Sequence, residues 1–151
     1  SMKCDTFAEA CTVAAEEGHL DCVIHLHEHG FTLDLGTSTG AASNGHLECL
    51  QYVRDQGCAW GTDTFAAAAL FGQLEALRYL HENNCPHDED AMNNAARLGY
   101  LECVQYLHEI GHEWDEETTE VAASHGHVST LKYLHDHGCP CITIWSEQLK
   151  Y

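Results

Sequence analysis

Apolar residues recur with helical spacing in five stretches of the chain. In each stretch they lie two, five and eight positions after a glycine, which places them at i, i+3 and i+6 on one face of a helix. The five sets are Leu20, Val23 and Leu26; Leu47, Leu50 and Val53; Leu74, Leu77 and Leu80; Leu101, Val104 and Leu107; and Val128, Leu131 and Leu134. A pair of alanines precedes each glycine, so a second helix can approach closely. The pattern predicts five helix-turn-helix units.

The units repeat with a period of 27 residues. One column holds Gly18, Gly45, Gly72, Gly99 and Gly126, and a second holds Gly30, Gly57, Asn84, Gly111 and Gly138. Asn is the other residue that tolerates a left-handed backbone, so the second column predicts helix C-caps with positive φ. The first column predicts the tight turn between the two helices of a unit.

Each unit therefore has a helix of about ten residues, a turn, a helix of about eleven residues and a short connector. We expect Asp88 and Asp115 to cap the helices that follow them. Helices this short must bury their apolar faces against the next unit, which is typical of a solenoid. The sequence predicts one all-α domain over 1–151, with repeats near 5–33, 34–60, 61–87, 88–114 and 115–141 and a partial capping helix at 142–151.

The string "AAxxGHLExxxYLHxxG" resembles the second half of an ankyrin repeat, and it occurs in five versions along the chain. Two features differ from the usual repeat: the unit is 27 residues long rather than about 33, and the Thr-Pro-Leu-His opening is absent. The resemblance is to the short-repeat ankyrins abundant in amoebae, oomycetes and large DNA viruses. It implies a solenoid with shortened or absent β-hairpin fingers that serves as an intracellular protein-binding scaffold.

Charge and cysteine content narrow the possible partners and the location. The formal net charge of −18 excludes nucleic acid and anionic membranes as expected partners, and favours a basic protein. No apolar stretch is long enough for a membrane helix. The nine cysteines fall in helical patterns, which indicates reduced thiols. We expect a monomer in the cytoplasm, or in the host's cytoplasm if the chain is viral.

The Cys and His columns are candidates for chemistry, but most of them also accept Ala, Thr, Phe or Gln. Stacked units lie about 10 Å apart, so equivalent residues of neighbouring units cannot share a zinc ion. The best local cluster is His135, His137, Cys139 and Cys141, and its Cys-x-Cys spacing differs from the Cys-x-x-Cys of common zinc sites. No phosphate loop or nucleophile motif is present. We expect no enzyme activity and no cofactor.

The two residues before each turn glycine vary freely, as recognition residues would. The resemblance places them on the concave side of the stack. Leu70, Phe71, Arg97 and Leu98 form an apolar centre with one Arg, and Asn44 and His125 lie at the rim. Such a composition is typical of binding hot spots. The alternative is that Leu70 and Phe71 pack against neighbouring helices.

Two other features stay open. The acidic connectors, Asp88–Asp90 and Glu113–Glu117, suit a basic peptide or form a solvated face. Trp60 and Trp114 share a connector column, and we expect them to pack between repeats. The predicted function is a protein-protein interaction scaffold. The alternatives are a metal-binding module that uses the C-terminal His/Cys cluster, and a structural spacer without a specific partner.

Overall fold

The computed structural model describes residues 2–87 and 89–139, and the side chains from residue 9 onward. Within these ranges the chain forms ten helices and no strand. They are α1 (Met2–Glu16), α2 (Leu20–Glu28), α3 (Leu35–Ser43), α4 (Leu47–Asp55), α5 (Thr62–Leu70), α6 (Leu74–Glu82), α7 (Asp90–Leu98), α8 (Leu101–Glu109), α9 (Glu116–Ser124) and α10 (Val128–Asp136). The all-α repeat prediction is confirmed.

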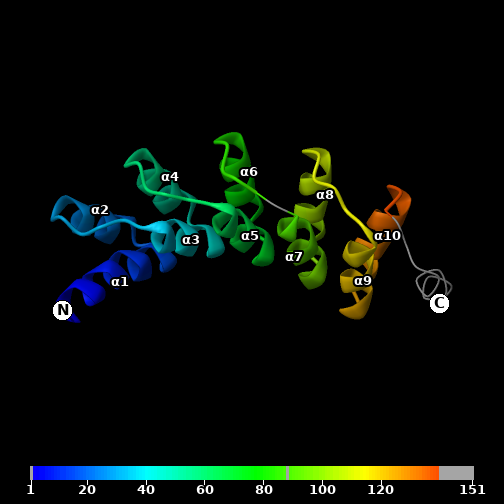
Figure 1. The fold of residues 1–151 in the computed structure, drawn as a ribbon, viewed down its shortest axis with the longest axis horizontal. Coiled ribbons are helices and arrows are strands. Elements are labelled where there is room, and N and C mark those ends of the chain that lie inside the picture. Colours follow the sequence, from blue (N-terminus) through cyan, green and yellow to red (C-terminus); the bar gives the residue numbers. More distant parts are fainter. Residues whose placement is uncertain (1, 88, 140–151) are drawn as a thin grey trace. The chain divides into compact units, whose positions relative to one another are not determined.

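The chain divides into two compact units, Ser1–His87 and Asp88–Tyr151. The division falls where the third predicted repeat ends. In the first unit α1, α3 and α5 pack side by side, and α2, α4 and α6 form a second layer (Figure 1). In the second unit α7 packs beside α9, and α8 packs beside α10. Each repeat thus contributes one helix to each layer of its unit.

The apolar face predicted for the second helices forms much of the core. Leu50, Leu77 and Leu107 are fully buried, and so are most of the alanines before the turn glycines. Small alanine side chains allow the paired helices to approach closely, and the leucines fill the space between repeats. Phe65 of α5 and Met92 of α7 complete the cores of their units.

The helix ends follow the predicted glycine columns. The second column has φ between 61° and 95°, and its one exception to glycine, Asn84, has φ 61°. The turn column is also left-handed, with φ between 68° and 75°. A backbone hydrogen bond closes each second helix, for example from Cys58 N to Val53 O at 2.9 Å. The C-cap prediction is therefore confirmed.

Two first helices begin at an aspartate that caps them. Asp115 accepts a hydrogen bond from Thr118 N at 3.3 Å, which confirms its predicted role. Asp34 accepts one from Thr37 N at 3.0 Å, and Thr37 Oγ1 accepts one from Asp34 N at 3.2 Å. This reciprocal capping box satisfies the backbone N–H groups of Asp34 and Thr37 at the start of the helix. The predicted cap Asp88 and the predicted capping helix at 142–151 lie outside the described residues.

The connectors 31–34, 58–61 and 112–115 have no regular secondary structure. They lead directly from the left-handed residue at the end of one repeat to the cap of the next, as expected for short fingers. Among the described residues, no helix has the length and apolar character needed to cross a membrane.

Candidate functional site

One face of each first helix carries the predicted recognition residues. We call it the first-helix face and define it by four positions with spacing i, i+4, i+7 and i+8, which share one side of a helix. The positions hold Glu9, Val13, Glu16 and Glu17 at α1; Gly36, Gly40, Ser43 and Asn44 at α3; Asp63, Ala67, Leu70 and Phe71 at α5; Asp90, Asn94, Arg97 and Leu98 at α7; and Glu117, Val121, Ser124 and His125 at α9. Only Gly40 is fully buried among them.

The predicted apolar centre of this face is accessible in both units. Phe71 is 52% exposed in the first unit, and Leu98 is 41% exposed in the second. Leu70 and Arg97, which precede them in the chain, are half-buried. Monomeric proteins tolerate single exposed apolar residues. Here the two lie at the same repeat position, so the same face is apolar in both units.

The polar side chains of this face also form hydrogen bonds at the ends of the first helices. Asn44 donates from Nδ2 to Gly40 O at 3.0 Å, and the Nδ1 of His125 donates to Val121 O at 2.8 Å. Each carbonyl also accepts the backbone N–H of the same residue at 3.3 Å, so the side chain adds a second hydrogen bond at the helix end. Arg97 donates to Asn94 Oδ1 at 3.3 Å. The predicted rim residues Asn44 and His125 remain exposed despite these bonds.

Residues of the next repeat hold the first-helix face in place. His127 donates from Nε2 to Arg97 O at 2.8 Å, 30 residues earlier in the chain. Gln73 occupies the same repeat position and donates from Nε2 to Ser43 O at 3.1 Å, again across 30 residues. Sequence reasoning missed these bonds. The available signal was a column of side chains, His46, Gln73 and His127, that can each donate a hydrogen bond.

The two connector tryptophans pack between repeats, as predicted. Trp114 stacks on His108 of its own repeat at 4.0 Å and meets Tyr133 of the next repeat edge-on at 6.1 Å. Trp60 lies edge-on to Tyr79 of the next repeat at 5.9 Å between ring centroids. Both indoles therefore link neighbouring repeats on the side of the connectors.

The buried cysteines serve packing and hydrogen bonding. Cys58 donates from Sγ to Asp34 O at 3.0 Å, which ties the end of a repeat to its start. Cys85 bonds Gly61 O at 3.4 Å in the same way. Burial raises the pKa of the Cys85 and Cys103 thiols to about 11. Because the thiolate is the nucleophile and the metal ligand, protonated thiols of this kind suit neither role.

The C-terminal cluster is not assembled as a metal site in the part that the structure describes. Cys139 is buried and bonds Asp115 O at 3.5 Å, while His135 and His137 are exposed. The Nδ1 of His137 donates to Tyr133 O at 2.9 Å. Over residues 2–87 and 89–139, no group of three or more His, Cys, Asp or Glu side chains is placed to hold a metal ion. Cys141 lies outside these ranges.

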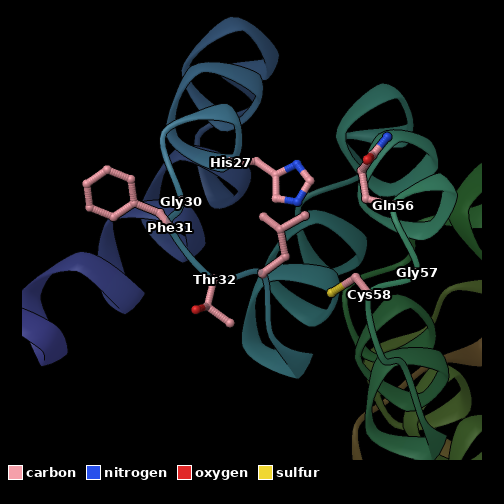
Figure 2. A pocket seen from close by; sticks show the side chains of 8 residues that line it. His27, Gly30, Phe31, Thr32, Gln56, Gly57 and Cys58 are labelled. Atoms are coloured by element: carbon pink, nitrogen blue, oxygen red, sulfur yellow. The ribbon is translucent and has the colours of Figure 1, made fainter.

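A hollow of about 330 Å³ lies between the first two connectors (Figure 2). It is lined by His27, Gly30, Phe31, Thr32, Leu33, Gln56, Gly57 and Cys58. Its ionisable groups already have partners, because the Nδ1 of His27 lies 3.0 Å from the Tyr52 hydroxyl and the Cys58 thiol bonds Asp34 O. The hollow is thus a gap between short connectors whose side chains hold the repeats together.

The acidic connectors are exposed. Glu89, Glu113 and Glu116 face solvent, and Asp115 uses a carboxylate oxygen to cap α9. Asp88 lies outside the described residues. Among the described residues of these connectors, Asp115 has a capping role and the glutamates face solvent, which favours the solvated-face interpretation.

The family follows from a comparison of sequences. A family model of ankyrin repeats, three copies long, matches residues 39–118, which is more than half of the chain. The chain belongs to the ankyrin-repeat family. Among solved structures, the ankyrin repeat domain of human ASB11 aligns with a TM-score of 0.74 and 20% identity. The alignment covers 86% of this chain and 69% of that domain, and shows that the two share a fold. A comparison with curated proteins found no match.

Proposed function

We propose that this ankyrin-repeat protein binds a partner protein through its first-helix face. Leu70 and Phe71 make the contact in the first unit, and Arg97 and Leu98 make it in the second. Asn44 and His125 lie at the rim of this contact. Ankyrin-repeat domains generally mediate interactions between proteins and are typically not enzymes, and the proposal assigns this chain the same kind of role inside the cell.

The exposure of Phe71 carries the proposal. More than half of its surface meets solvent, although Phe65 of the preceding helix α5 is fully buried. Burying an exposed Phe side chain contributes about 1.5–3 kcal/mol. Leu98 repeats the arrangement in the second unit. A partner that covers Phe71 or Leu98 would gain binding free energy from apolar surface that the fold leaves exposed.

The test is affinity capture from a lysate of the source cell. The parent chain is compared with a Leu70→Asp, Phe71→Asp variant and with a Val128→Asp control. Val128 is 55% exposed but lies on α10, outside the first-helix face. The proposal predicts a partner that the parent and the control retain and that the double variant loses. All three chains must show cooperative thermal unfolding.

The two alternatives give different results in the same experiment. A structural spacer predicts that the parent and the double variant recover the same proteins. A metal-binding module predicts metal in the purified parent chain, which elemental analysis detects, and predicts loss of that metal in a His135→Ala, His137→Ala variant.

A further inference from the structure

The first-helix face of the first unit is low in its middle. Its central helix, α3, presents Gly36, Gly40 and Ser43, and the larger Asn44 lies only at the C-terminal end of that helix. The side chain of Glu16 reaches over from α1, and a Cβ placed on Gly40 would lie 2.7 Å from its Cγ. Since Gly in a helix costs about 1 kcal/mol relative to Ala, these two glycines weaken α3. They leave a strip of small residues between α1 and α5, and the Glu16 side chain covers part of it.

The width of this strip suits one helix. Neighbouring packed helices lie about 8–10 Å apart, so the axes of α1 and α5, on either side of α3, are about 16–20 Å apart. A helix with its side chains is about 10–12 Å across. A helix laid over α3 can therefore contact both α1 and α5.

Exposed apolar side chains stand on both sides of the strip. Val13 on α1 is 53% exposed, and Phe71 at the end of α5 is 52% exposed. Leu70, beside Phe71, is half-buried. A ligand lying between α1 and α5 would cover apolar surface on both flanks, as expected for a helix-in-groove interaction.

The charge around the strip has one sign. Glu9, Glu16 and Glu17 on α1 and Asp63 on α5 are all exposed. The sequence contains no Lys or Arg between residues 4 and 53 or between 55 and 77. Arg54, which separates these stretches, lies over the Trp60 ring on the connector side. A ligand with positive charge is therefore favoured, and an acidic one is repelled.

We propose that the strip over α3 binds an amphipathic basic helix of a partner protein. Its Lys or Arg side chains pair with Glu16 and Glu17, and its apolar side chains cover Val13 and Phe71. The proposal rests on the proposed function and adds the chemical class of the partner. It depends only on residues of the first unit.

The test selects ligands from a library with no preset charge or apolar pattern. A displayed library of random 16-residue peptides is selected against the whole chain, and the enriched peptides are measured by fluorescence anisotropy. The proposal predicts enriched peptides with net positive charge and apolar residues spaced i, i+3 and i+4. It also predicts that Glu16→Lys, Glu17→Lys weakens their binding at least tenfold, and that Phe71→Asp does the same.

The matched control reverses two acids that lie off this face. Glu28 and Glu82 are exposed and end α2 and α6, so a Glu28→Lys, Glu82→Lys variant has the same change of charge at comparable helix ends. The control should retain the parent affinity. Equal weakening by both pairs would show attraction to the overall negative charge and overturn the proposal.

The remaining outcomes separate this proposal from the proposed function. The enriched peptides could bind the Glu16→Lys, Glu17→Lys variant but not the Phe71→Asp variant. That result would support binding through the first-helix face and would overturn the proposal that its ligand is a basic helix. Neutral or acidic enriched peptides, or no enrichment, would overturn it as well. If the Phe71→Asp variant still binds the captured partner and the enriched peptides, both proposals are wrong.

Discussion

The imidazole ring of His108 lies flat on the indole of Trp114, with centroids 4.0 Å apart and planes 4° apart. In the second repeat, Arg54 takes the equivalent place, with its guanidinium carbon 4.1 Å from the centroid of Trp60. Both planar groups can stack on an indole, and such contacts contribute about 0.5–1.5 kcal/mol. The same contact between a connector tryptophan and a planar side chain thus occurs in the second and fourth repeats.

We expect His108→Arg to preserve the free energy of unfolding, because Arg54 already makes this contact. His108→Ala removes the ring and should cost about 1 kcal/mol. Urea unfolding followed by tryptophan fluorescence measures both variants. Equal losses in the two variants would show that the stacked geometry contributes nothing.

The turn glycines provide a matched pair for a steric prediction. Gly99 and Gly126 have φ 75° and 72°, so an added methyl group strains both by about 1–2 kcal/mol. A Cβ at Gly99 would also collide with the His127 ring, whereas a Cβ at Gly126 meets nothing within 4 Å. We expect Gly99→Ala to destabilise the chain more than Gly126→Ala in urea unfolding. In a His127→Ala background the difference between the two should disappear.

The hydrogen bond from His127 to Arg97 O predicts which residues can replace His127. Gln73 makes the equivalent bond in the third repeat, so we expect His127→Gln to keep most of the stability. His127→Ala leaves the carbonyl without this donor and should lower the free energy of unfolding by about 1 kcal/mol. Thermal unfolding by circular dichroism compares the three chains. A Gln variant as unstable as the Ala variant contradicts the assignment.

Cysteine burial predicts a loss of stability in alkali. The pKa of Cys103 is raised from 9.0 to about 11 by burial, so the folded chain holds this proton after the unfolded chain has lost it. The free energy of unfolding should therefore fall as the pH rises from 9 to 11. Cys103→Ala should make this fall shallower, since Ala76 shows that the column accepts Ala.

Cys22→Ala is the control for this effect, because Cys22 occupies the same column but is exposed. Its slope over the same pH range should match that of the parent chain. Tyrosines also titrate in this range. The contribution of Cys103 is therefore taken from the difference in slope of the free energy of unfolding against pH between the variants and the parent chain. Identical slopes in all three chains would refute the role assigned to Cys103.

Local chemistry made much of the fold predictable. The 27-residue glycine columns fixed the helix pairs, and the occurrence of Asn84 among them identified the left-handed C-caps. Asp115 stood directly before the segment predicted as the first helix of the fifth repeat, where a cap is needed. Trp60 and Trp114 shared a column with Leu33, His87 and Cys141, and we expected this column to pack between repeats. In each case the signal was the type of a residue and its position in the repeat.

Hydrogen bonds between residues far apart in the sequence were harder to predict. The Cys58 thiol bonds Asp34 O, and the His127 ring bonds Arg97 O, and both partners are backbone atoms. A backbone carbonyl leaves no mark in the sequence, so only the donor columns were visible. The candidate recognition residues were found because they vary at one helical position. Their exposure depends on neighbouring helices: Gly40 is buried, and the Glu16 side chain of α1 lies next to it.

Hydroxyl-radical footprinting with a captured partner tests the central claim most directly. Phe71 and Leu98 are exposed by 52% and 41% in the free chain, and Val128 on α10 is exposed by 55%. Binding through the first-helix face predicts that oxidation of Phe71 and Leu98 falls several-fold while that of Val128 stays the same. Unchanged oxidation of Phe71 and Leu98, with protection of Trp60 and Trp114 instead, would place the partner on the connectors and contradict the account.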